Sequence, residues 1–178
     1  MLPFTVPTHE QVTPEAQAIF DQFQKSMGKM PNLYATIGYS ANALATYTQY
    51  VRGQAKNTFH AHDREGIYLI VSQLNGCEYC LASHTESAIR NGWKEEDTLA
   101  LRADAHPERK WQVLHAIIRS AIDNRGQVPD SLLKDFSALG FGDTAIIDLF
   151  VLINVMSFTN YVYRLIQVPI DFRPAQPV

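Results

Sequence analysis

Helical periodicity runs through almost the entire 178-residue chain and constrains its fold more than any other feature. Apolar residues recur at steps of three and four, and Gly, Pro and Asn-Gly signals separate the segments. No alternating strand pattern competes with them. The pattern predicts one all-α domain over residues 1–178, with extended proline-containing ends at Met1–Val12 and Val168–Val178. We expect helices that begin near Pro14, Pro31, Ser40, His62, Cys77, Glu95, Pro107, Asp130 and Asp143.

Composition narrows the class of partner. The net charge is −3 and only 19% of residues are charged, so there is no basic surplus to bind nucleic acid or an anionic membrane surface. The N-terminus has no signal-peptide pattern, and the longest apolar run, Ala145–Phe158, is interrupted and too short to span a bilayer. We expect a cytoplasmic protein with neither a nucleic-acid nor a membrane partner.

The last predicted helix, from Asp143 to about Ile166, is apolar on almost every side. Such a helix must be buried between neighbouring helices or at a subunit interface. Its one central amide, Asn154, is expected to hydrogen-bond to another helix.

The chemistry-bearing residues fall in one pattern, Glu65-x11-Cys77-x2-Cys80-x3-His84, which includes both cysteines of the chain. A disulfide between Cys77 and Cys80 would close almost no loop and would stabilise the fold little. In a reducing compartment this spacing is typical of redox or metal chemistry rather than of a structural crosslink.

Asn75-Gly76 separates two amphipathic segments, which predicts an antiparallel helix hairpin. At 1.5 Å rise per residue, Glu65 lies roughly 14 Å below the top of the first helix, and His84 roughly 11 Å below the top of the second. The spacing therefore places Glu65 beside His84. Cys80 lies one turn above His84, and Cys77 lies at the helix N-terminus.

This order suits thiol chemistry, because the thiolate is the reactive form of cysteine. His84 can accept the proton of Cys80, and Glu65 can orient the imidazole. The helix N-terminus instead favours a thiolate at Cys77. From the residues alone, the first attacking thiol stays open.

The motif resembles that of alkyl hydroperoxidase D-like proteins in the carboxymuconolactone decarboxylase-like superfamily. The segment Ser72-Gln73-Leu74-Asn75-Gly76-Cys77-Glu78-Tyr79-Cys80, the earlier Pro31-Asn32-Leu33-Tyr34 and the late Asn160 resemble its peroxidase-related branch. The resemblance implies a helical subunit that assembles into homotrimers or hexamers. It also implies peroxide reduction without a cofactor or metal, with an external thiol or dithiol as reductant.

By the same resemblance, Cys80 attacks a hydroperoxide, Cys77 resolves the sulfenic acid as a disulfide, and Glu65 and His84 form the proton relay. One residue departs from the pattern. The founding members carry a histidine between the two cysteines, whereas this chain carries Tyr79. The departure bears on the relay and on the reductant, but leaves the dithiol intact.

Four other hypotheses about the function are compatible with the sequence. Superfamily members include carboxymuconolactone-type decarboxylases, although these generally lack the cysteine pair. A disulfide reductase that does not act on peroxides would use the same dithiol. A metal site would combine Cys77, Cys80 and His84 with His62 or Glu65. A helical oligomer or adaptor without turnover would leave the thiols inert.

Overall fold

The computed structural model describes residues 4–178, and in this part of the chain all regular secondary structure is helical. The nine α-helices are α1 (Pro14–Met27), α2 (Asn32–Ile37), α3 (Ala41–Gly53), α4 (Ala61–Leu74), α5 (Glu78–Arg90), α6 (Glu95–Arg102), α7 (Arg109–Asp123), α8 (Asp130–Ala138) and α9 (Asp143–Ile166). The all-α prediction is confirmed, and the predicted helix starts hold to within two residues.

Local signals set several of these boundaries. Pro14 occupies the first turn of α1, where its missing N–H removes no helical hydrogen bond. Gly28 ends the same helix in the left-handed conformation, at φ 76°. The Oγ of Ser40 accepts a hydrogen bond from the N–H of Ala43 and thereby caps α3.

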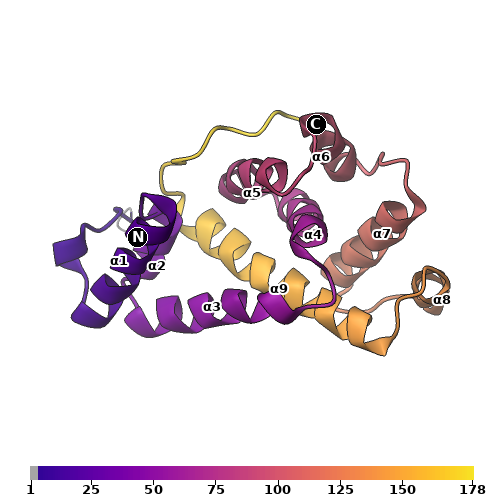
Figure 1. Ribbon diagram of the computed structural model, residues 1–178, viewed down its shortest axis with the longest axis horizontal. Helices are drawn as coiled ribbons and strands as arrows, with labels where there is room; N and C mark the ends of the chain where they lie inside the picture. Colours follow the sequence, from indigo (N-terminus) through magenta and orange to yellow (C-terminus); the bar gives the residue numbers. More distant parts are fainter. Residues whose placement is uncertain (1–3) are drawn as a thin grey trace.

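Helix α4 lies at the centre of the molecule, in contact with α5, α6, α7 and α9 (Figure 1). Its residues from Gly66 to Ser72 are all buried. Burial of each large aliphatic side chain stabilises the fold by about 1.5–3 kcal/mol, so this helix is a major source of core stability. It therefore gives the residues at its two ends a rigid support.

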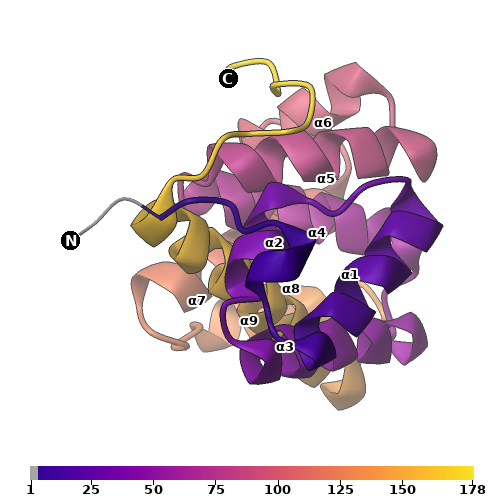
Figure 2. The same ribbon diagram turned by 90° about the vertical axis from the view of Figure 1, so that its left-hand side faces the viewer.

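The chain ends differ in structure. Met1–Pro3 lie outside the described residues, and within the rest of the expected extended N-terminal segment His9–Gln11 form a short 3-10 helix (η1). A second one, η2 (Gln54–Lys56), follows α3. Residues 168–178 contain no helix, and they run from the end of α9 across α5 to α6 (Figures 1 and 2).

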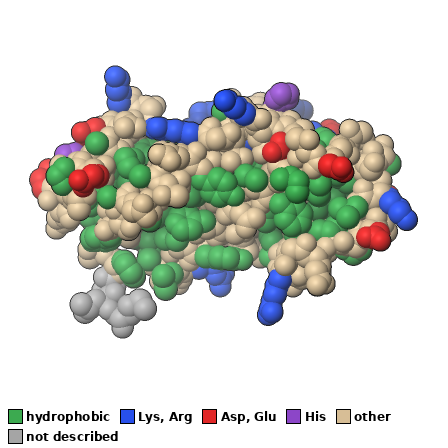
Figure 3. Space-filling model, turned by 90° about the horizontal axis from the view of Figure 1, so that it is seen from below, with side chains coloured by type: hydrophobic (Ala, Val, Ile, Leu, Met, Phe, Trp, Pro, Cys, Tyr) green, Lys and Arg blue, Asp and Glu red, His purple; other side chains and the backbone are tan. Residues whose placement is uncertain are grey.

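Helix α9 is 24 residues long, and by length and composition alone it is apolar enough to cross a membrane. The helix predicted from Asp143 to about Ile166 is confirmed, and the apolar run Ala145–Phe158 lies within it. Its inner side packs against α2, α3, α4 and α5 as part of the core. On its outer side, Ile147, Tyr161 and Leu165 are 58–66% exposed. Figure 3 shows hydrophobic side chains spread over the face where α3 and α9 lie in Figure 1.

Candidate functional site

The site begins at the turn between α4 and α5. Gly76 has φ +63°, a conformation that disfavours other residues, and it allows the N–H of Cys77 to donate to the carbonyl of Ser72 at 2.9 Å. Cys77 is the N-cap of α5, and Cys80 lies in the first turn of that helix. A tight turn thus brings both thiols onto the end of a helix that packs along α4.

Glu65 of α4 and His84 of α5 meet about two helical turns away from the hairpin turn. The Nδ1 of His84 donates to Oε2 of Glu65 at 2.7 Å, and Oγ of Ser87 donates to the other carboxylate oxygen at 3.0 Å. The spacing predicted the first of these contacts but not the second. With Nδ1 engaged, Nε2 is the nitrogen that can exchange a proton.

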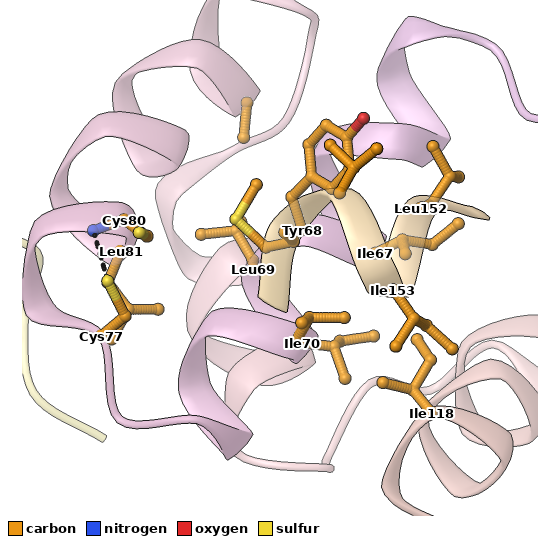
Figure 4. Packing of buried hydrophobic residues seen from close by; sticks show 14 of the residues in the cluster. Ile67, Tyr68, Leu69, Ile70, Cys77, Cys80, Leu81, Ile118, Leu152 and Ile153 are labelled. Carbon is orange, nitrogen blue, oxygen red and sulfur yellow. Dashed lines mark hydrogen bonds between the residues drawn. The ribbon is translucent and has the colours of Figure 1, made fainter. Parts of the chain in front are cut away.

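The thiol of Cys77 is stabilised in its ionised form. A hydrogen bond from the Cys80 thiol lowers the pKa of Cys77. The Cys80 backbone N–H, 3.3 Å from Cys77 Sγ (Figure 4), acts in the same direction, as does the charge of Arg164. These contacts outweigh the opposing effect of burial. Both cysteines are free, so the structure describes the reduced pair.

Burial has the opposite effect on Cys80. It raises the pKa of this thiol well above its usual value, and the neighbouring Cys77 raises it further. Of the two thiols, Cys80 therefore holds its proton more tightly. The two thiols differ in access as well, because Cys80 lines a cavity whereas Cys77 is fully buried.

This cavity has a volume of about 320 Å³ and lies between α1, α2, α3, α5 and the C-terminal segment. Cys80 and His84 open onto the same space, which brings the thiol and the imidazole to one substrate-sized cavity. Its other lining residues are Gln22, Phe23, Ser26, Met27, Pro31, Leu33, Tyr34, Tyr47, Thr48, Val51, Arg52, Tyr79, Ser83, Ser87, Arg90, Thr159 and Phe172.

Tyr79, which takes the place of the relay histidine, holds the C-terminal segment. Its hydroxyl donates to Oδ1 of Asp171 at 2.6 Å and accepts the N–H of Leu33 at 3.2 Å. Asp171 also pairs with Lys29, 3.2 Å from its Oδ2. Phe172 packs edge-on against the Tyr79 ring and lines the cavity. Sequence reasoning found neither Asp171 nor Phe172, because no spacing rule links them to the dithiol.

A buried amide network supports the turn from the side of α9. The Nδ2 of Asn160 donates to Oγ of Ser72, and its Oδ1 accepts from Nδ2 of Asn75 at 3.0 Å. The prediction for Asn154 was wrong. This side chain is exposed, and it donates to the carbonyl of Phe150 in its own helix. The two asparagines differ because they lie on different sides of α9, with Asn160 on the inner side and Asn154 on the outer side.

The side chains considered for a metal site are not gathered into one. His62 stacks on Trp93, with ring centroids 4.2 Å apart, on the far side of Glu65 from the thiols. Within residues 4–178, no group of three or more His, Cys, Asp or Glu side chains is arranged to hold a metal ion.

Residues 41–123, which contain all four motif residues, match the carboxymuconolactone decarboxylase family. An uncharacterized peroxidase-related protein from Silicibacter sp. has a similar structure, with a TM-score of 0.81 at 18% identity over 98% of this chain and 94% of its own. No curated protein sequence matches the chain significantly.

Two further structures share the fold. An uncharacterized peroxidase-related protein from Ralstonia eutropha, described as an alkylhydroperoxidase AhpD core, has a TM-score of 0.81 at 16% identity, over 96% of this chain and 90% of its own. The debrominase Bmp8, as a cysteine-to-alanine variant in complex with 2,3,4-tribromopyrrole, has a TM-score of 0.76 at 15% identity, over 96% of this chain and 92% of its own. Residues 41–123 thus resemble the carboxymuconolactone decarboxylase family, and the chain shares its fold with the alkylhydroperoxidase AhpD core and with another peroxidase-related protein.

Proposed function

We propose that the protein is a cofactor-free thiol peroxidase that reduces organic hydroperoxides through Cys80 and Cys77. The observation that carries this proposal is that Cys80 and His84 line one cavity while Glu65 binds the far nitrogen of the imidazole. A thiol, a base and a carboxylate that orients the base are the groups that nucleophilic thiol chemistry requires.

In the first step His84 Nε2 accepts the Cys80 proton, and the thiolate sulfur attacks one oxygen of the peroxide. The S–O bond forms as the O–O bond breaks, and the leaving alkoxide takes a proton to become an alcohol. Cys80 is oxidised to a sulfenic acid while the peroxide gains two electrons. Cys77, already favoured as a thiolate, attacks the Cys80 sulfur and releases water. An external thiol or dithiol then reduces the disulfide.

We assign Cys80 as the attacking thiol because a substrate in the cavity can reach it. A thiolate at Cys77 is easier to form, but this sulfur has no exposed surface and does not line the cavity. Cys80 reaches the cavity and has His84 one helical turn away to accept its proton. The low pKa of Cys77 suits the second step, where it must be ionised to attack the sulfenic acid.

Hydroperoxide consumption by the wild type and by both Cys→Ser variants tests the proposal. With cumene hydroperoxide and dithiothreitol, we expect Cys80→Ser to lose turnover. Once reduced and freed of dithiothreitol, Cys77→Ser should consume about one equivalent of peroxide and leave a sulfenic acid on Cys80 that dimedone traps. Full turnover by Cys80→Ser would refute the peroxidase, and a trapped sulfenic acid on Cys77 would reverse the order of the thiols.

The family match also favours a second candidate, a decarboxylase acting on a carboxylated lactone. Such a reaction needs no dithiol cycle, so Cys77→Ser and Cys80→Ser should leave the rate of carbon dioxide release unchanged. A disulfide reductase would be distinguished by fast reduction of a model disulfide together with inertness toward hydroperoxides.

We further propose that the subunit forms a homo-oligomer, a trimer or hexamer, through the outer side of α9. The support is the set of exposed apolar residues Ile147, Tyr161 and Leu165 on this helix. Multi-angle light scattering of the wild type and of Leu165→Glu tests it. We expect the variant to dissociate, and a monomeric wild type would refute the assembly. We expect the assembled protein to be cytoplasmic.

A further inference from the structure

The cavity that contains Cys80 has a closed end and an open end. At the closed end Cys80, Tyr47 and Thr159 are all buried. At the open end Met27, Arg52 and Arg90 are exposed to solvent. A ligand that reaches the sulfur must therefore extend inward from this rim, with its reactive group first.

Between the two ends the wall formed by α1, α2 and α3 is aromatic. The rings of Phe23 and Tyr34 lie 5.1 Å apart, and those of Tyr34 and Tyr47 lie 5.7 Å apart. Leu33 and Phe172 add apolar surface to the same space. Burial raises the pKa of Tyr34 to about 12, so its hydroxyl is neutral at physiological pH. The middle of the cavity therefore favours an uncharged, apolar body.

The charge at the rim has one sign. Among the lining residues in the described part of the chain, Arg52 and Arg90 are cationic and none is Asp or Glu. Arg52 donates to the neutral amide of Gln22 at 2.6 Å, and Arg90 has only a loose contact with Glu86 at 3.8 Å. An exposed pair at that distance is weak. Both guanidinium groups thus retain donors and charge for an anion.

The distance from the sulfur to the rim follows from helix geometry. Cys80, His84, Ser87 and Arg90 are spaced by three or four residues and share one side of α5, so Arg90 lies about 15 Å along the helix from Cys80. The arginine side chain reaches back over part of this length. An anionic group bound at the rim would therefore be separated from the reacting group by an extended body.

We propose that the cavity binds elongated apolar carboxylates and that, as a peroxidase, the protein prefers hydroperoxides with a carboxylate at the end remote from the O–O bond. The carboxylate is held by Arg52 and Arg90, the body lies against the aromatic wall, and the peroxide reaches Cys80. The kinetic preference rests on the proposed peroxidase function, whereas the binding does not.

Binding is tested first, with ligands that cannot react. Calorimetric titration would compare octanoate with octanol on the wild type and on the variants Arg52→Gln, Arg90→Gln and the double variant. Arg125→Gln, which changes an exposed arginine that does not line the cavity, is the matched control. Thermal unfolding of each variant verifies that it is folded.

We expect octanoate to bind more tightly than octanol, and the double variant to lose about tenfold or more of the octanoate affinity. Arg125→Gln should leave the affinity unchanged. Equal affinities for octanoate and octanol, or octanoate affinity that the folded double variant retains, would overturn the proposal.

Kinetics then separate this proposal from the peroxidase itself. A carboxylated fatty-acid hydroperoxide and neutral cumene hydroperoxide would be compared by kcat/KM. We expect the double variant to lower the value about tenfold for the carboxylated substrate alone. Arginine-dependent octanoate binding without peroxide turnover would support the site and refute the peroxidase. Peroxide turnover that the double variant leaves unchanged for both substrates would refute the preference and retain the peroxidase.

Discussion

The α4–α5 hairpin and the wall that faces it differ in how they are encoded. The hairpin carries Glu65, Cys77, Cys80 and His84 within 20 residues, inside the region that matches the family. The facing wall is assembled from α1, α2, α3, the C-terminal segment and one turn of α9, and of these only α3 lies inside that region. The difference suggests that the hairpin determines the reaction and the wall determines which molecule undergoes it.

The sharpest test of this division is His84→Gln, for which we expect the largest effect. A positioned general base contributes about 10²–10⁴-fold to a rate, so kcat/KM for hydroperoxide should fall by that amount. KM should change little, because the wall is intact. Stopped-flow measurement over a range of pH checks this, and rescue of the rate as pH rises would show that the lost group deprotonates a thiol. An unchanged rate would remove His84 from the relay.

A smaller effect is expected for Glu65→Gln, which keeps the shape but removes the charge that orients His84. We predict a loss of about tenfold in kcat and a shifted pH profile, since a positioning group acts through the base. Ser87→Ala is the matched control. Ser87 donates to Oε1 of the Glu65 carboxylate at 3.0 Å, whereas His84 binds the other oxygen. Equal pH profiles for Glu65→Gln and the wild type would contradict the role.

On the wall, Asp171→Asn should change KM several-fold and leave kcat nearly intact. The variant weakens the contacts of Asp171 with Tyr79 and Lys29, and so loosens Phe172 at the cavity. Steady-state kinetics with substrates of different size measure the change, with Asp130→Asn on exposed α8 as control. If kcat fell as much as for His84→Gln, the division between hairpin and wall would fail.

The smallest change concerns ionisation within the hairpin. The pKa of Cys77 is lowered and that of Cys80 is raised, so absorbance at 240 nm should report two thiolate steps, one below and one above pH 9. Cys77→Ser should remove the lower step. The pKa of Cys80 is higher in the folded than in the unfolded protein, so the protonated thiol contributes to the stability of the fold. This contribution is fully present below the unfolded pKa and is lost as pH rises through the folded pKa. Cys80→Ala should therefore reduce the loss of stability above pH 9.

Sequence reasoning succeeded where the determinants are local. Helix starts at Pro14 and Ser40, the Asn75-Gly76 break and the meeting of Glu65 with His84 all follow from steps along one or two helices. It failed where the position of a side chain depends on which side of a helix it occupies, or on packing between segments distant in the sequence. Asn154 is exposed on the outer side of α9, while Asp171 reaches Tyr79 across 92 residues of sequence. No periodicity in the chain encodes that second contact.

The Tyr79–Asp171 hydrogen bond has an evolutionary consequence. Tyr79 stands between the two cysteines, yet its partner lies in the last segment of the chain and makes the hydroxyl part of a partly buried polar pair. Replacement of the tyrosine alone would leave Asp171 with one partner fewer, and replacement of the aspartate alone would leave the Tyr79 hydroxyl without the acceptor of its proton. These two positions should therefore covary among relatives, and sequences with histidine between the cysteines should be free to lose the aspartate.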